Sequence, residues 1–136
     1  MEKTHADHGT RVVTDLTFEK AVEVVTDALG SEGFGVLTKI DVQATLKEKL
    51  DAEFRRYVIL GACNPSLAFQ ALNAEIEVGL LLPCNVIVYE QNGGSVVAIV
   101  NAISMLGVID NPELEPIASE AKARLDRVIE TMQGQG

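Results

Sequence analysis

The pair Cys-Asn occurs twice in the sequence, within Cys63-Asn64-Pro65 and within Pro83-Cys84-Asn85. An ionised thiol is a nucleophile and a ligand for soft metals, and an asparagine amide both donates and accepts hydrogen bonds. Two cysteines in one site could act as a redox pair, hold a soft metal such as Cu(I), or bind a sulfur-containing ligand. The alternative is that both are small buried apolar residues, as free cysteines usually are. We therefore expect any site to lie within Tyr57–Tyr89, which contains both pairs.

The neighbouring prolines suggest different settings for the two thiols. Asn64 is a preferred helix N-cap and Pro65 suits the first helical position, so a helix is predicted to start here. Cys63 would then precede free backbone amides and a helix dipole, which favour a thiolate. Cys84 follows Pro83, which cannot donate to a strand ladder and so predicts a sheet edge or a bulge. A bulge there would aim the Cys84 side chain toward a cleft.

Other polar candidates are few. Asn85, in the middle of an apolar strand, needs buried partners, a polar pocket or a dimer contact. Asp41 is expected to cap a short helix, and a carboxylate near the cysteines would matter chemically. His5 and His8 lie in a polar leading segment where a frayed terminus is expected rather than a metal site. Ordinary acid–base catalysis is therefore not expected, and whether the protein is an enzyme stays open.

Composition narrows the class of protein. The 136 residues fit one domain. Hydrophobic residues make up 47% of the chain, but aromatic residues only 4%, with no Trp, so the core is expected to be aliphatic. A net charge of −9 argues against nucleic acid and against anionic membrane surfaces. The sequence contains no apolar run of membrane-helix length and no signal-peptide stretch at its start, so we expect a cytoplasmic protein with reduced thiols.

The periodicity of apolar residues predicts an α+β chain. We expect a flexible segment over residues 1–9, a single domain over 10–132 and a frayed terminus over 133–136. The predicted strands are Arg11–Asp15, Phe34–Ile40, Phe54–Ala62, Gly79–Glu90 and Ser95–Ile103. Helices are predicted to start after Thr17, Asp41 and Asn64. The last helix is predicted to begin near Asn111 or Pro116, after an irregular connection over Met105–Glu115.

Several of these elements carry further expectations. The predicted buried face of the helix after Asn64 is Leu67, Ala68, Ala71 and Leu72, and that of the short helix after Asp41 is Val42, Leu46 and Leu50. The run Leu80–Val88 is apolar on both faces of a strand. If the first and last helices cover one face of the sheet, a second body must cover the other, either the middle helix or another subunit. We expect a homodimer.

Three stretches carry a resemblance to a known family: GFGVLTKIDVQATLKEKL, then YVILGACNP, then GLLLPCNVIVYE. They resemble the family catalogued as domain of unknown function 302, over about residues 10–132. The resemblance implies a two-layer sandwich, a mostly antiparallel sheet with helices packed on it, with a topology similar to the TATA-binding protein half-domain, and frequent dimers. It implies no DNA binding for an acidic chain. Where the family usually has Asp-Pro, this chain has Asn101-Ala102, which removes a carboxylate.

The family has no assigned function, so no catalytic residue and no cofactor carries over. Our leading interpretation is a homodimeric domain that binds a small molecule or a metal. Cys63 would be the reactive or ligating thiol, Cys84 its partner, and Asn64 and Asn85 would orient a polar ligand, with Asp41 as a further candidate. One alternative is a thiol redox enzyme or sulfur carrier, which requires a thiolate at neutral pH. The other is a structural protein-interaction domain with inert core cysteines.

Overall fold

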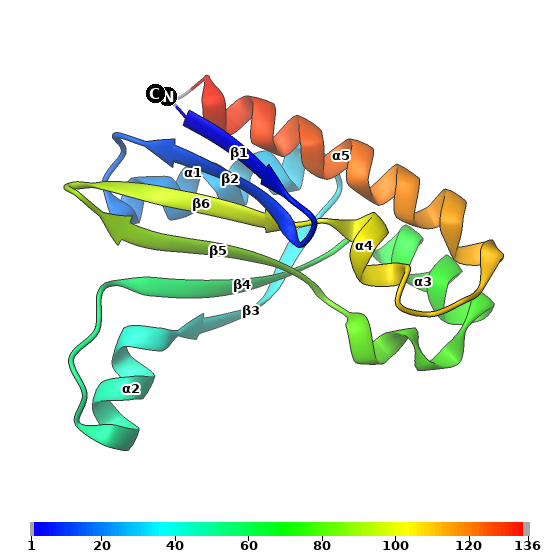
Figure 1. The fold of residues 1–136 in the computed structure, drawn as a ribbon, viewed down its shortest axis with the longest axis horizontal. Coiled ribbons are helices and arrows are strands. Elements are labelled where there is room, and N and C mark those ends of the chain that lie inside the picture. Colours follow the sequence, from blue (N-terminus) through cyan, green and yellow to red (C-terminus); the bar gives the residue numbers. More distant parts are fainter. Residues whose placement is uncertain (1, 135–136) are drawn as a thin grey trace.

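A computed structural model describes residues 2–134 as a six-stranded sheet with helices on it (Figure 1). Every neighbouring pair of strands is antiparallel, in the order β1-β2-β6-β5-β4-β3. The strands are β1 Glu2–Ala6, β2 Gly9–Thr14, β3 Gly35–Asp41, β4 Tyr57–Cys63, β5 Cys84–Gln91 and β6 Gly94–Val100. The helices are α1 Phe18–Ser31, α2 Val42–Leu50, α3 Pro65–Ala74, α4 Ala102–Leu106 and α5 Glu115–Gln133, with 3₁₀ turns η1 Ile76–Leu81 and η2 Pro112–Leu114. The predicted α+β class is confirmed.

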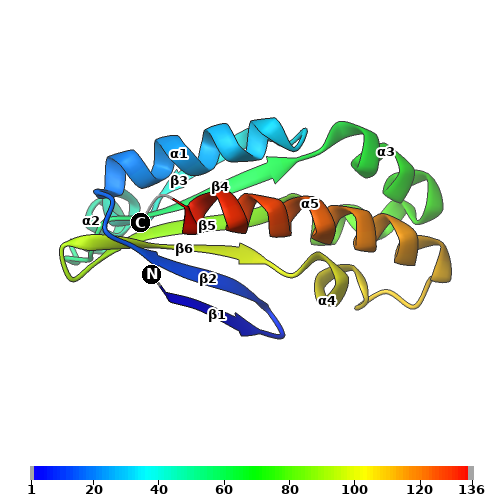
Figure 2. The ribbon, with the colours of Figure 1, turned by 90° about the horizontal axis from the view of Figure 1, so that it is seen from above.

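Helices α1 and α5 lie side by side on one face of the sheet (Figure 2). Strand residues at every second position point toward these helices and are buried; in β4 they are Val58, Leu60 and Ala62. They pack against the inner stripes of both helices in one aliphatic core. The helices contribute Ala21, Val25, Ala28, Leu29, Ala121, Leu125, Val128, Ile129 and Met132 to it.

The other face of the sheet carries no helix along its centre among residues 2–134 (Figure 2). Its middle row runs across five paired strands as Ile40, Ile59, Ile87, Ala98 and Arg11. Four of these five side chains are apolar, and the row is half-buried except for Ile40, which is exposed. We call the residues of this row, together with the stacked rings of Tyr57 and Tyr89, the open face.

The structure confirms the helix starts predicted after Thr17 and Asp41. Asp41 begins α2 by accepting a hydrogen bond from the Ala44 amide at 2.9 Å. Thr17 does the same for α1, from the Lys20 amide at 3.2 Å. The β5–β6 hairpin turns at Asn92-Gly93, where φ is +51° and +81°.

Two expectations about the apolar run are wrong. Gly79–Glu90 is not one strand, because its first part belongs to η1 and β5 begins only at Cys84. Pro83 marks neither an edge nor a bulge, because β5 is an interior strand and the proline lies just before it, after a cis Leu82–Pro83 bond. No ladder hydrogen bond is lost there, which is why an interior strand tolerates it.

The chain ends and the connection before α5 also differ from expectation. Residues 2–6 form β1 rather than a flexible segment, because the edge of β2 offers them a strand to pair with. At the other end α5 continues to Gln133, while residues 1, 135 and 136 lie outside the described range. The connection after β6 contains α4, capped by the Asn101 side chain, which accepts hydrogen bonds from the Ile103 and Ser104 amides. Asn101 thus has a structural role that needs no carboxylate.

Candidate functional site

A cavity of about 370 Å³ lies at one end of the sheet, where β3, β4 and β5 meet α3, η1 and α5. Of the seventeen residues that line it, only Thr38, Cys63, Asn64 and Cys84 have a polar atom in the side chain, and none is charged. The others are Phe34, Leu37, Ala62, Leu67, Ala68, Ala71, Leu72, Gly79, Leu82, Pro83, Leu106, Ile117 and Ala121. A site of this kind favours an apolar ligand, because charged groups would lose their hydration without gaining a partner.

The structure brings the two cysteines together at this cavity. Cys84 is buried and stands opposite Ala62 in the β4–β5 pair, and Cys63 is half-buried at the next position of β4. Both are free thiols. Burial and, to a lesser extent, the nearby Cys63 together raise the pKa of Cys84 to about 11. At neutral pH the Cys84 thiol is therefore uncharged and forms part of an apolar wall.

The raised pKa of Cys84 makes stability depend on alkaline pH. The folded pKa is about 11 against an ordinary value of 9.0, so the folded chain holds this proton more tightly than the unfolded chain does. Below pH 9 this proton contributes up to about 3 kcal/mol to the free energy of unfolding, and the contribution is lost as pH rises through 11. We expect Cys84→Ala to flatten the fall in unfolding free energy between pH 9 and 11, measured by urea denaturation at each pH. An unchanged slope in the variant would contradict the assignment.

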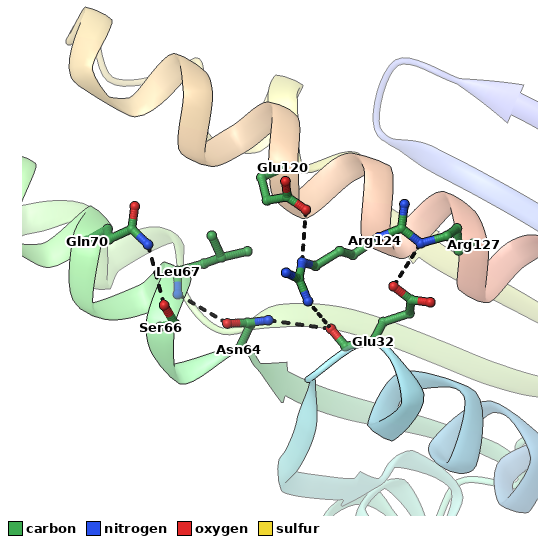
Figure 3. Close-up of polar contacts among 8 residues, drawn as sticks. All are labelled: Glu32, Asn64, Ser66, Leu67, Gln70, Glu120, Arg124 and Arg127. Atoms are coloured by element: carbon green, nitrogen blue, oxygen red, sulfur yellow. Dashed lines mark hydrogen bonds and ion pairs between the residues drawn. The ribbon is translucent and has the colours of Figure 1, made fainter.

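Asn64 anchors a polar junction beside the cavity (Figure 3). Its side-chain oxygen accepts the Leu67 amide at 3.1 Å, and its amide donates to the Glu32 carbonyl at 3.5 Å. That carbonyl also accepts from Arg124 at 3.1 Å, and the Glu32 carboxylate pairs with Arg127 at 2.9 Å. The junction joins the end of α1, the start of α3 and the middle of α5. Both functional groups of the Asn64 side chain are occupied, so it positions the site rather than the ligand.

The close approach at this junction also explains a glycine. Gly33 has a φ of +82°, and a Cβ there would lie 2.9 Å from the Asn64 side-chain nitrogen. The position therefore requires glycine for both conformation and space.

Removing the Asn64 side chain should destabilise the fold measurably. We expect Asn64→Ala to lower the free energy of unfolding by about 1–2 kcal/mol, because a cap and a buried hydrogen bond are lost together. Asn64→Asp keeps the cap acceptor but loses the donor to Glu32, so its free energy of unfolding should lie between those of the wild type and Asn64→Ala. Chemical denaturation of the three proteins measures this order, and an Asp variant as weak as Ala would argue against the capping role.

The structure does not bring Asn85 and Asp41 to the cavity. Asn85 follows Cys84 in β5, so its side chain points to the opposite face, where it is exposed. It needs no buried partner there and borders a shallow depression beside Arg11 on the open face. Asp41 lies six residues along β3 from the end that pairs with Cys63, or about 20 Å away at the rise of a strand. Its carboxylate caps α2 in solvent.

The lining residues outside Tyr57–Tyr89 come from two places: Phe34, Leu37 and Thr38 lie just before or within β3, and the other three lie on α4 and α5. Leu106, Ile117 and Ala121 carry no chemical signature, and only packing decides that they face a void. By contrast, the α3 face predicted as buried core is the cavity wall: only Ala71 is fully buried, and its neighbours on that face remain half-buried. The apolar face of α3 was therefore the signal in the sequence that could have pointed to the cavity.

Two further findings concern metals and membranes. Within residues 2–134, no three His, Cys, Asp or Glu side chains gather closely enough to hold a metal ion. His5 instead has its ring nitrogen 2.8 Å from the Thr10 hydroxyl across the β1–β2 pair. No helix in the described part of the chain combines the length and apolar character needed to cross a bilayer.

The fold and cavity together define a small α+β domain with an apolar pocket at the end of an antiparallel sheet. Residues 10–132 match the family described as domain of unknown function DUF302, and the chain belongs to that family. The chain is similar to the crystal structure of an uncharacterized conserved protein DUF302 from Bacillus stearothermophilus, with 31% sequence identity and a TM-score of 0.86. That match covers 93% of this chain and 99% of the other. No curated protein matches the sequence.

Proposed function

We propose that this protein binds an apolar small molecule in the cavity beside Cys63 and Cys84. The observation that carries the proposal is a 370 Å³ cavity with no charged residue in its lining. Its volume falls within the range of about 300–1,000 Å³ that is typical of small-molecule sites. The polar ligand expected from the two asparagines is replaced by an apolar one, because Asn64 is occupied and Asn85 lies on the other face.

The thiols support binding better than catalysis. A thiol with a pKa of about 11 is protonated at neutral pH, and a protonated thiol is a poor nucleophile and a poor metal ligand. This weighs against Cys84 as half of a redox, sulfur-carrier or Cu(I) site. Both cysteines are free, which also supports a reducing compartment such as the cytoplasm. Recovery of the protein in a cell's membrane or secreted fraction would count against that location.

A direct titration tests the binding proposal. N-phenyl-1-naphthylamine is an uncharged apolar probe whose fluorescence rises when it leaves water. We expect saturable binding with one probe per chain and a dissociation constant in the micromolar range, which corresponds to about −8 kcal/mol. Prior alkylation of Cys63 should reduce binding, because its adduct would project into the cavity. A fluorescence rise that stays linear with probe concentration would refute the proposal.

We further propose that two copies associate through the open face. Its middle row holds three isoleucines and an alanine across four strands, and a homodimer interface requires such an apolar centre. Each copy carries a charge of −9, so a stable contact between copies must use a surface that is poor in acidic residues. The middle row contains one charged residue, Arg11, which is basic.

Two features of the single chain support a second copy as the partner that covers the open face. The Nε atom of Arg11 is buried without a hydrogen-bond partner among the described residues, and such a group costs about 1–3 kcal/mol. A carboxylate from the other copy would satisfy it. Helix α2 has nine residues and buries none of them, leaving Leu50 71% exposed, although short helices need packing to persist in water.

The mass in solution tests the association. We expect sedimentation equilibrium to give twice the chain mass of 14.6 kDa at micromolar concentration. A single species at 14.6 kDa under those conditions would refute the dimer while leaving the cavity proposal untouched.

A further inference from the structure

A second cavity adjoins the apolar one. It lies between α3 and α5 and has a volume of about 340 Å³. The two cavities share three lining residues, Asn64, Leu67 and Ile117. The rest of the second lining differs sharply in character, because it includes the side chains of Ser66, Gln70, Glu120 and Arg124. A polar pocket that is open to the surface therefore adjoins the apolar cavity, and the two share part of their lining.

We infer that the ligand is amphipathic, with an aliphatic tail in the apolar cavity and an uncharged oxygen-bearing head, such as an alcohol, amide or ester, in the polar one. This inference rests on the proposed function, because it places the tail in the same apolar cavity. It adds the chemical class of the ligand and the residues that would recognise its head.

A change of the Leu67 side chain can connect the apolar cavity to the polar one. Leu67 is half-buried and projects from α3 toward α5 (Figure 3). Its backbone amide is held by Asn64, so the helix stays fixed while the side chain changes rotamer. Rotamer changes of partly exposed side chains take picoseconds to nanoseconds. An aliphatic chain passing here would also replace the contacts that Leu67 gives up.

The polar cavity suits an acceptor oxygen without charge. Arg124 donates to the Glu120 carboxylate at 2.9 Å and to the Glu32 carbonyl at 3.1 Å, which leaves further N–H donors of its guanidinium for a ligand. Glu120 offsets the Arg124 charge and would repel a carboxylate head. On the α3 side, Gln70 donates a 3.4 Å hydrogen bond to Ser66, and both side chains are exposed, so they can exchange this bond for one to a ligand at small cost, unlike the buried Asn64 amide.

The test uses ligands with one tail and different heads. Displacement of N-phenyl-1-naphthylamine reports the affinity of 1-decanol, decanoate and decyltrimethylammonium for the full chain. We expect decanol to bind at least tenfold more tightly than either ion. Gln70→Leu should weaken decanol about fivefold, since one hydrogen bond of about 1 kcal/mol is lost, and Ser66→Ala should do the same. In both variants the affinity of the probe should fall less than that of decanol, because the probe has no oxygen-bearing head.

Intermolecular NOEs supply a readout that a merely structural effect would not produce. We expect the C1 protons of decanol to lie near Gln70 and Ser66, and its terminal methyl near Ala62 and Cys84. Equal affinities of decanol for wild type and Gln70→Leu, or a head group found at Thr38 on the other side of the cavity, would overturn the amphipathic ligand while the apolar site stands. Absence of any saturable probe binding would instead overturn the proposed function itself.

Discussion

Ala71→Phe should abolish probe binding while leaving the protein folded. Ala71 is 2% exposed and its methyl group faces the 370 Å³ cavity from α3. A phenyl ring there would fill space that the ligand needs, so we expect at least a fiftyfold loss of affinity for N-phenyl-1-naphthylamine. Overpacking a filled core costs about 1–3 kcal/mol, but here the ring enters an existing void, so the melting temperature should change little. Fluorescence titration and thermal denaturation of the same sample measure both effects.

The matched control places the same ring two residues further along the same helix. Asn73 is exposed and does not line the cavity, so Asn73→Phe should keep the wild-type affinity. Ala121→Phe fills the cavity from α5 and should reproduce the loss seen at Ala71. If both filled variants melt as cooperatively as wild type and still bind the probe with wild-type affinity, the probe binds elsewhere and the proposed site is wrong.

Ile87→Glu should convert the proposed dimer into a monomer. Ile87 lies at the centre of the open face, paired with Ile59 on one side and Ala98 on the other. In a two-fold dimer each substitution introduces two carboxylates into the interface, and desolvating unpaired charges costs several kcal/mol each. We expect the dimer dissociation constant to rise at least a hundredfold, measured by sedimentation equilibrium over a concentration series. Circular dichroism should remain that of the wild type, since Ile87 is only half-buried within one chain.

Val108→Glu is the matched control for this change. Val108 is 74% exposed on the connection after α4, away from the sheet, so the same loss of an exposed aliphatic group should not alter the mass. Arg11→Met tests the role of Arg11 in the same interface, because it removes the unpartnered Nε and keeps much of the side-chain volume. A dimer that survives Ile87→Glu with unchanged affinity would show that copies meet on another surface.

Local physical chemistry made parts of this fold predictable. Caps at Thr17, Asp41 and Asn64 depend on residues three positions away, and the Asn92-Gly93 turn depends on two residues that tolerate positive φ. The apolar residues of α5 recur at helical spacing from Ile117 to Met132, and this stripe is buried. The stripe of α2 was misleading, since Val42, Leu46 and Leu50 repeat at helical spacing yet none is buried. Spacing reports an apolar face, but it cannot supply a partner for that face.

The sequence by itself determined that this is an acidic α+β domain of the DUF302 family with two Cys-Asn pairs within Tyr57–Tyr89. Only the tertiary structure decided what those pairs do. Because side chains alternate across a strand, the β4–β5 register directs Cys84 into the cavity and Asn85 to the opposite face. Because Asn64 meets the end of α1, its amide is occupied by Glu32, a contact between residues 32 positions apart. The cavity is a property of packing, formed where α3, α5 and the sheet fail to fill the space between them, and no single stretch of sequence records it.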